Sequence, residues 1–372
     1  MDLEHLTPRH IREIEPYVPS RPDDELKSMY GCRLLHRLNN NENPLGPPPA
    51  AQAAVNRFPP TSAALYPSGD AFHLRQALAE TLHMHPDQFL VGNGSCELIS
   101  CVVRAFCAAG DNIVTSDQTF AVYEWVAQQT AVERRLVPLN EYTFDDEAML
   151  RQIDARTKVI FLCNPNNPTG TYWQRARVMQ FLQRVAGRCI VVLDEAYFEY
   201  VEDPEYCDGM RLLDQHPNLI IFRTFSKMFG LAGLRIGYLA GAPNVVDVIR
   251  HAYIVYSVNS IAQAAAEAAL RHAREHIEET RAMVREGKKL LRAGLAQLGL
   301  QYLCGEGSYC MIKVPMSDML LYRRLMRRGL MVRTMTGFRF PGWIRVTIAG
   351  RAVLQQFIEA LASEVAGPAG SR

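Results

Sequence analysis

The sequence predicts an α/β protein with a larger domain built on a mostly parallel sheet and a smaller α+β domain. In the first part, over residues 60–255, short apolar runs alternate with amphipathic helical stretches, which is typical of parallel strands covered by helices on both faces. After residue 259 one long helical stretch leads to separate strands and helices. A length of 372 residues also favours two domains.

The elements follow in order along the chain. In the larger domain we expect strands at residues 112–116, 157–163, 189–194, 219–224 and 234–240, and helices at 96–108, 120–130 and 172–186. Residues 259–298 contain no proline and predict one long helix. Beyond it we expect strands at 308–315, 331–334 and 343–348, and helices at 318–328 and 351–365.

The domain boundaries follow from this pattern. We expect residues 1–58 to form an N-terminal arm and part of the smaller domain, 59–258 the larger domain, and 259–372 a linking helix and the rest of the smaller domain. The segment ENPLGPPP at 42–49 is too rich in proline for a helix or a central strand. It predicts an extended arm that crosses to a partner or lines a cleft.

Composition excludes several classes of function. Forty basic and 39 acidic residues leave a net charge of +1, so no footprint for nucleic acid or an anionic membrane is present. No apolar run reaches the roughly 18 residues that span a bilayer, and the first residues lack the apolar core of a signal peptide. None of the nine cysteines forms a C-x-x-C pair, and His83 and His85 suit a solvated loop. We therefore expect buried free thiols, no metal and a cytoplasmic protein.

Lys227 stands beyond a predicted buried strand in FRTFSKMFGLAGLRIGYLAG, residues 222–241. Apolar neighbours desolvate such an amine, lower its pKa and free it to form an imine. Ser226 and Arg235 supply a hydroxyl and a guanidinium suited to a phosphate nearby. The alternative is a surface lysine with a structural arginine.

Two other polar side chains end predicted strands. Asp194 closes the strand in CIVVLDEAYFEY and can pair with a protonated ring nitrogen. Asn167 follows the strand that leads into CNPNNPTG, where its amide suits a phenolate oxygen. A helix cap and a plain turn are the respective alternatives, and magnesium binding at Asp194 has no phosphate-binding loop to accompany it.

The turn in GNGSCELISCVVRAFC enters a helix at about Ser95. Its backbone N–H groups and the helix dipole favour an anion. Only Gly92 and Gly94 match a dinucleotide-binding fingerprint, which therefore is not present, and ordinary helix capping is the alternative.

These segments occur in one order, and together they resemble the fold-type I aminotransferases of class I/II, which depend on pyridoxal 5′-phosphate (PLP). The resemblance is closest to the histidinol-phosphate aminotransferase family. It covers nearly the whole chain, in EPYVP, NENPLGP, YPSGD, CNPNNPTG, VVLDEAYFEY, RTFSKMFGLAGLRIGY, VNSIAQAAAEAAL and WIRVTIAG.

The resemblance implies roles around the cofactor. Lys227 would form the Schiff base and move the proton between the substrate α-carbon and cofactor C4′. Asp194 would pair with the pyridinium nitrogen, and Asn167 and Tyr197 would bind the phenolate oxygen. Phe120 would stack on the ring. The phosphate would be held by Ser95, Cys96, Ser226 and Arg235.

The resemblance also implies partners for the substrate. Tyr66 matches a tyrosine that reaches the phosphate of the neighbouring subunit, so a homodimer with shared sites is expected. Arg345 matches the arginine that grips the α-carboxylate. Tyr17, Asn43 and Arg333 match substrate-side positions, with Arg333 a candidate for a distal anionic group.

Several positions depart from the family pattern. Cys96 replaces the usual Asp, and Phe120 replaces a common Tyr. Tyr253 and Val255 stand where a basic, proline-containing stretch is usual, and Phe338-Arg339-Phe340 is bulkier and more basic than usual. We expect these positions near substrate-side loops, where they bear on the substrate and not on the class of reaction.

The sequence therefore predicts an aminotransferase with two half-reactions that use an amino acid and a 2-oxo acid. Histidinol phosphate with imidazole acetol phosphate is the first candidate pair, and glutamate with 2-oxoglutarate the second. An aromatic or other amino-acid aminotransferase, and a PLP-dependent decarboxylase of an amino-acid phosphate, are alternatives on the same scaffold. A non-catalytic binding protein is disfavoured by the intact Lys227, Asp194 and Arg235.

Overall fold

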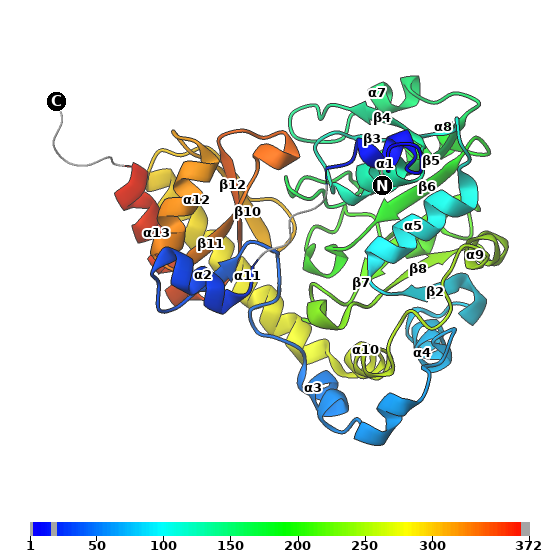
Figure 1. The fold of residues 1–372 in the computed structure, drawn as a ribbon, viewed down its shortest axis with the longest axis horizontal. Coiled ribbons are helices and arrows are strands. Elements are labelled where there is room, and N and C mark those ends of the chain that lie inside the picture. Colours follow the sequence, from blue (N-terminus) through cyan, green and yellow to red (C-terminus); the bar gives the residue numbers. More distant parts are fainter. Residues whose placement is uncertain (1–2, 16–20, 366–372) are drawn as a thin grey trace.

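The computed structural model describes residues 3–15 and 21–365, which form two bodies joined by the long helix α11 (Arg274–Gln297) (Figure 1). The larger body contains a seven-stranded sheet in the order β2-β8-β7-β6-β5-β3-β4. Its strands are β2 (Phe89–Gly92), β3 (Asn112–Ser116), β4 (Glu133–Val137), β5 (Thr157–Cys163), β6 (Ile190–Asp194), β7 (Leu219–Thr224) and β8 (Gly237–Gly241).

Five neighbouring strands, from β4 to β7, are parallel, and β8 runs antiparallel to both β7 and β2. The central strands β5, β6 and β7 are buried almost throughout, as near-continuous apolar runs require. The expected mostly parallel sheet is therefore confirmed.

Helices cover this sheet, and α3, α4 and α10 lie together at one end of the larger body (Figure 1). They are α1 (Arg9–Arg12), α3 (Pro49–Asn56), α4 (Phe72–Leu82), α5 (Ser95–Phe106), α6 (Val122–Gln129), α7 (Asp146–Arg151), α8 (Arg175–Val185), α9 (Pro243–Arg250) and α10 (Ser260–His272). Helix α10 packs on α3 and α4, while α5 packs on the sheet through β2 and β8. Within residues 3–15 and 21–365, no helix is long and apolar enough to cross a membrane.

The smaller body is a five-stranded mixed sheet in the order β1-β11-β12-β10-β9. Its strands are β1 (His36–Leu38), β9 (Tyr302–Leu303), β10 (Tyr309–Lys313), β11 (Leu330–Thr334) and β12 (Trp343–Thr347), and its helices are α2 (Asp23–Tyr30), α12 (Asp318–Arg327) and α13 (Arg351–Val365). Strand β1 pairs in parallel with β11, so the start of the chain completes this sheet.

The structure contains several elements that were not expected, and it differs from the expected ones as follows. The single helix expected at 259–298 is two helices that meet at Ala273, where the backbone leaves the helical region. The strand expected at 234–240 begins only at Gly237, because Arg235 is left-handed with φ of 58°. Strand β4 was not expected because its sequence, ERRLV, places charges on an exposed edge.

The segment at 42–49 lies between the two bodies, and α3 begins at its last proline. Asn39 and Asn41 just before it are buried. The chain passes so close to the loop after Lys227 that a Cβ on Gly230 would lie 2.2 Å from the Gly46 carbonyl oxygen. Glu42, at the start of this segment, lines the cavity described below, which agrees with an arm that lines a cleft.

Candidate active site

A cavity of about 480 Å³ opens where β5, β6 and β7 end, as expected for an open α/β sheet. It gathers residues predicted from five separate segments. Lining it are Ser95, Cys96, Phe120, Asn167, Asp194, Tyr197, Ser226, Lys227 and Arg235, together with Asn40, Glu42, Cys163, Ala196, Thr224, Ala232 and Gly233.

Lys227 lies just beyond the end of β7, in the turn that leads toward β8. Its Nζ donates to the Asn40 carbonyl oxygen at 2.8 Å. Burial, aided by the positive charge of Arg345, lowers the pKa of the amine to about 8. Far more of this amine is therefore neutral near neutral pH than of an ordinary lysine, as a nucleophilic lysine requires.

Asp194 is a buried carboxylate at the end of β6. It accepts hydrogen bonds from the Tyr123 hydroxyl at 2.6 Å and from the Ala196 backbone N–H at 3.1 Å. Burial raises its pKa to about 6, and the bond from Tyr123 opposes that rise. The carboxylate is thus ionised at neutral pH and can bind a protonated ring nitrogen.

Sequence reasoning missed Tyr123, although a signal for it existed. The residue lies on α6, and Phe120 precedes that helix by two positions, within the segment 120–130 that the sequence predicts as one helix. Its ring is fully buried, stacks on Phe161 at 4.7 Å and meets Phe120 edge to face at 5.6 Å. Packing on both sides therefore fixes the hydroxyl that contacts Asp194.

The turn before α5 forms a cradle for an anion. Gly94 is left-handed with φ of 73°, and Ser95 and Cys96 begin the helix. A Cβ on Gly94 would lie 2.4 Å from Arg235 Nη2, so the guanidinium stands directly against this turn. Burial raises the pKa of Cys96, which leaves its thiol neutral. The helix N-terminus and Arg235 together favour a phosphate.

Arg345, on β12 of the smaller body, lies beside the cavity and contacts Asn167, which lines it. The guanidinium is buried and donates to Asn167 Oδ1 and, at 2.7 Å, to the Asn39 carbonyl oxygen. Its Nε has no partner among the described residues. The Tyr197 hydroxyl accepts from Asn41 Nδ2 at 2.7 Å, and burial raises its pKa to about 12, so it stays a donor. Arg345 and Tyr197 therefore place hydrogen-bond donors next to the same part of the cavity.

The remaining expected residues are placed differently. Arg333 lies opposite Arg345 on neighbouring strands, close to the site but outside the cavity lining. The Asn43 amide donates to the Met228 carbonyl oxygen at 2.8 Å and to Thr280 at 3.1 Å, so it braces the arm. Tyr66 is 84% exposed and stacks on Tyr256 at 4.9 Å. Tyr17 lies outside the described residues.

Comparison with known proteins adds the family to this geometry. The family named Aminotransferase class I and II matches residues 35–361. The chain belongs to this family. Histidinol-phosphate aminotransferase 2 of Pseudomonas fluorescens is 39% identical to it over 358 residues, 96% of each chain.

Two solved structures have the same fold. The histidinol-phosphate aminotransferase of Sinorhizobium meliloti, in complex with pyridoxal-5′-phosphate, has a TM-score of 0.86 at 26% identity and covers 97% of this chain and 98% of its own. An L-threonine-O-3-phosphate decarboxylase from Porphyromonas gingivalis has a TM-score of 0.79 at 22% identity, covering 89% and 100%. The fold alone therefore does not distinguish transamination from decarboxylation.

This aminotransferase depends on PLP, and the cavity fits that cofactor. Lys227 supplies a buried amine and Asp194 a buried carboxylate. The turn at Gly94 leaves an open cradle beside Arg235 that a Cβ would fill. An amine, an acidic partner for a ring nitrogen and an anion cradle are the three features that PLP needs.

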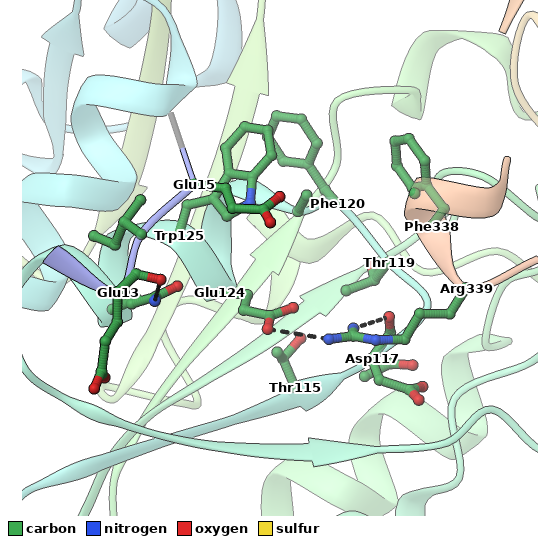
Figure 2. A pocket seen from close by; sticks show the side chains of 15 residues that line it. Glu13, Glu15, Thr115, Asp117, Thr119, Phe120, Glu124, Trp125, Phe338 and Arg339 are labelled. Atoms are coloured by element: carbon green, nitrogen blue, oxygen red, sulfur yellow. Dashed lines mark hydrogen bonds and ion pairs between the residues drawn. The ribbon is translucent and has the colours of Figure 1, made fainter. Parts of the chain in front are cut away.

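A second cavity of the aminotransferase, about 390 Å³, adjoins the first at the Phe120 ring, which lines both (Figure 2). Arg339 reaches into it from the loop after η6 (Thr336–Phe338) of the smaller body. It donates to the Asp117 carbonyl oxygen at 2.6 Å and to Glu124 Oε1 at 3.1 Å. These bonds tie the two bodies together beside the active site.

Proposed function

We propose that this aminotransferase exchanges the amino group of histidinol phosphate with imidazole acetol phosphate, using glutamate and 2-oxoglutarate as the second pair. The names of its full-length relatives support this choice of substrate, since proteins 35–39% identical to it are called histidinol-phosphate aminotransferases. The chemistry of the arginines beside the cavity supports it independently.

The observation that carries the proposal is the pairing of Arg333 and Arg345. The two residues lie opposite each other on the antiparallel strands β11 and β12. Their side chains therefore point to the same face of the smaller sheet, which places both guanidinium groups beside the cavity. The charge of Arg333 and the burial of Arg345 both lower the pKa of the Arg345 guanidinium, burial being the larger cause. A substrate with two negative charges relieves this repulsion, whereas a neutral amino-acid side chain does not.

Histidinol phosphate carries its two charges on one phosphate, and glutamate carries them on two carboxylates. We infer that Arg345 and Arg333 share the phosphate of histidinol phosphate, and that with glutamate Arg345 binds the α-carboxylate and Arg333 the distal carboxylate. The unpartnered Nε of Arg345 leaves a donor for this purpose. Tyr17 and Asn43 remain substrate-side proposals, with Asn43 acting through the arm that it braces.

The remaining roles follow from the cavity. When bound, PLP withdraws electrons from the substrate α-carbon and so makes its proton acidic. We propose that the Lys227 amine holds the cofactor and then moves that proton at its Nζ. Asp194 holds a proton on the ring nitrogen, Asn167 and Tyr197 orient the phenolate oxygen, and Phe120 packs on the ring. Ser95, Cys96, Ser226 and Arg235 bind the phosphate.

We further propose a cytoplasmic homodimer with shared sites. An exposed apolar patch, composed of Leu65, Tyr66, Phe72, Ile254, Val255 and Tyr256, supports the dimer because monomers rarely leave such a group uncovered. Nine cysteines without a disulfide suit a reducing compartment. Size measurement by light scattering would test the dimer, and Tyr66→Ala in one subunit would test whether it serves its neighbour's site.

Single-turnover spectroscopy tests the substrate. The holoenzyme is mixed with histidinol phosphate, glutamate, phenylalanine or tyrosine, and the change in cofactor absorbance is followed. We expect the fastest change with histidinol phosphate. An equal rate with phenylalanine would contradict the assignment, and release of CO₂ from an amino-acid phosphate would favour decarboxylation.

Arg333→Ala sharpens that test. We expect kcat/KM to fall about 10- to 100-fold for histidinol phosphate and glutamate, the loss of one charge-assisted contact of about 1.5–3 kcal/mol. Phenylalanine, without a distal charge, serves as the internal control and should change little. Equal losses for all three substrates would remove Arg333 from the distal-anion role.

A further inference from the structure

Cys304 and Cys310 face each other across the turn that joins β9 to β10. The two strands are antiparallel, with Leu303 opposite Met311, and the same register places Cys304 opposite Cys310. Both side chains are buried, and each thiol affects the ionisation of the other. Opposed residues of an antiparallel pair have Cα atoms about 4.5–5.5 Å apart, which is within the span that a disulfide bridges.

The surroundings make the two thiols unequal. The neighbouring Cys310 side chain, with the positive charges of Lys288 and Arg292, lowers the pKa of Cys304 despite its burial. Burial and the neighbouring Cys304 raise the pKa of Cys310. Both cations come from α11, and Arg292 Nη2 also donates to the Cys304 carbonyl oxygen at 2.5 Å. Since the thiolate is the nucleophile, Cys304 reacts first.

Other cysteines lack this combination. Burial raises the pKa of Cys107 to about 12 and that of Cys189 to about 11, and neither has a thiol partner that an antiparallel register sets opposite it. These two residues therefore behave as the inert, buried thiols expected from the sequence. Cys304 and Cys310 differ from them because each has the other as a thiol partner and because the pKa of Cys304 is lowered.

We propose that Cys304 and Cys310 form a reversible redox site, at which hydrogen peroxide joins the two thiols into an intramolecular disulfide. The Cys304 thiolate attacks one peroxide oxygen, the O–O bond breaks, and the other oxygen takes a proton and leaves as water. The Cys310 thiol then attacks the resulting sulfenic acid, the S–S bond forms and a second water leaves. Two thiols and one peroxide thus give one disulfide and two waters, and low-molecular-weight thiols reverse the bond.

The turn that this bond would close lies against the cofactor loop. The Glu306 backbone N–H donates to the Gly170 carbonyl oxygen at 2.8 Å, and the Tyr309 hydroxyl donates to the Asn166 carbonyl oxygen at 2.6 Å. Asn167 belongs to the same loop and lines the cavity. The redox site therefore adjoins the active site without containing any of its residues.

Peptide mapping of the holoenzyme tests the proposal. No lysine or arginine lies between Ala293 and Lys313, so trypsin releases one peptide that contains both cysteines. The reduced protein is treated with peroxide, quenched, denatured, alkylated with iodoacetamide and digested. We expect the peptide to lose two hydrogen atoms in mass and both alkylation sites, and dithiothreitol given before alkylation to restore both.

Single cysteine variants provide the controls. In Cys310→Ser the sulfenic acid on Cys304 should persist and be trapped by dimedone, whereas Cys304→Ser should leave Cys310 unmodified. Cys189→Ser should form the disulfide as the wild type does. The proposal is overturned if the peptide remains doubly alkylated at peroxide concentrations that oxidise other cysteines, or if Cys304 in Cys310→Ser traps no more dimedone than Cys189 does.

Discussion

Replacing Tyr123 with phenylalanine removes one hydroxyl from the active site, and we expect it to weaken PLP binding in a pH-dependent way. The hydroxyl donates to Asp194 at 2.6 Å inside the protein. A hydrogen bond to a charged group contributes about 1.5–3 kcal/mol. Since one pKa unit corresponds to about 1.36 kcal/mol, losing the bond raises the Asp194 pKa by roughly one to two units.

The direction of the pH effect follows from the charge on Asp194. Burial raises the pKa of this carboxyl to about 6, and the Tyr123 bond holds it from rising further. The ionised form that binds a ring nitrogen is present above this pKa and is lost as the pH falls through it. In Tyr123→Phe the midpoint should therefore move to roughly pH 7–8.

Titration of the apo-protein with PLP between pH 5.5 and 9 measures this shift directly as a dissociation constant. Wild-type affinity should weaken below about pH 6, and the variant should weaken at the higher midpoint while approaching wild-type affinity at pH 9. Tyr206→Phe, which removes a buried hydroxyl bonded to the Asn164 carbonyl oxygen, is the matched control. A loss that is the same at every pH would refute the electrostatic reasoning.

Two further predictions rest on buried charges. Because the Lys227 pKa is lowered to about 8, the rate at which apo-protein recombines with PLP should rise with pH and level off above about pH 8, and a rate independent of pH in stopped-flow absorbance would argue against a neutral-amine requirement. Arg223 binds the fully buried Glu195 at 2.7 Å and Asp208 at 2.7 Å, so Arg223→Leu should lower the free energy of unfolding by about 3–5 kcal/mol in urea titration. The double variant Arg223→Leu/Glu195→Gln should recover much of that loss, and no recovery would mean that packing, not the stranded charge, is responsible.

The polar residues at strand ends were predictable because their signals are local. Lys227, Asp194 and Asn167 each follow an apolar run long enough to be a buried strand, and parallel strands bring their carboxyl ends to one edge. The lowered pKa of Lys227 also follows from that burial. Such features need only the neighbouring sequence and the rule that orders parallel strands.

Contacts between distant segments were not predictable in this way. Arg345 binds the Asn39 carbonyl oxygen across 306 positions of sequence, and a backbone acceptor carries no signature in the side-chain pattern. The split of the expected long helix at Ala273 was also hidden, since alanine is a strong helix former. The shorter helix α10 packs on α3 and α4, tertiary contacts that the local sequence does not reveal.

The departures from the family pattern fall on two different surfaces. Val255 lies against the loop of Gly69, where a Cβ would come within 2.9 Å of it, and belongs to the exposed patch around Tyr66. That this position lies near the substrate stays a prediction, since Tyr66 in the same patch is the residue that we assign to the neighbouring subunit's site. In the homodimer that we propose, changes there would alter the surface that the second subunit meets.

Phe338 is the departure that reaches the arginines. Its ring lies 5.7 Å from the Arg333 guanidinium and 5.9 Å from that of Arg345, which is within cation–π range of both. The ring shields the faces of the two guanidinium groups and leaves their N–H edges as the donors for a substrate anion. A smaller residue at this position would leave the two guanidinium groups more exposed to water and their side chains less fixed in orientation. Among the unusual residues, Phe338 is therefore the one that contacts both arginines to which we assign the substrate anion.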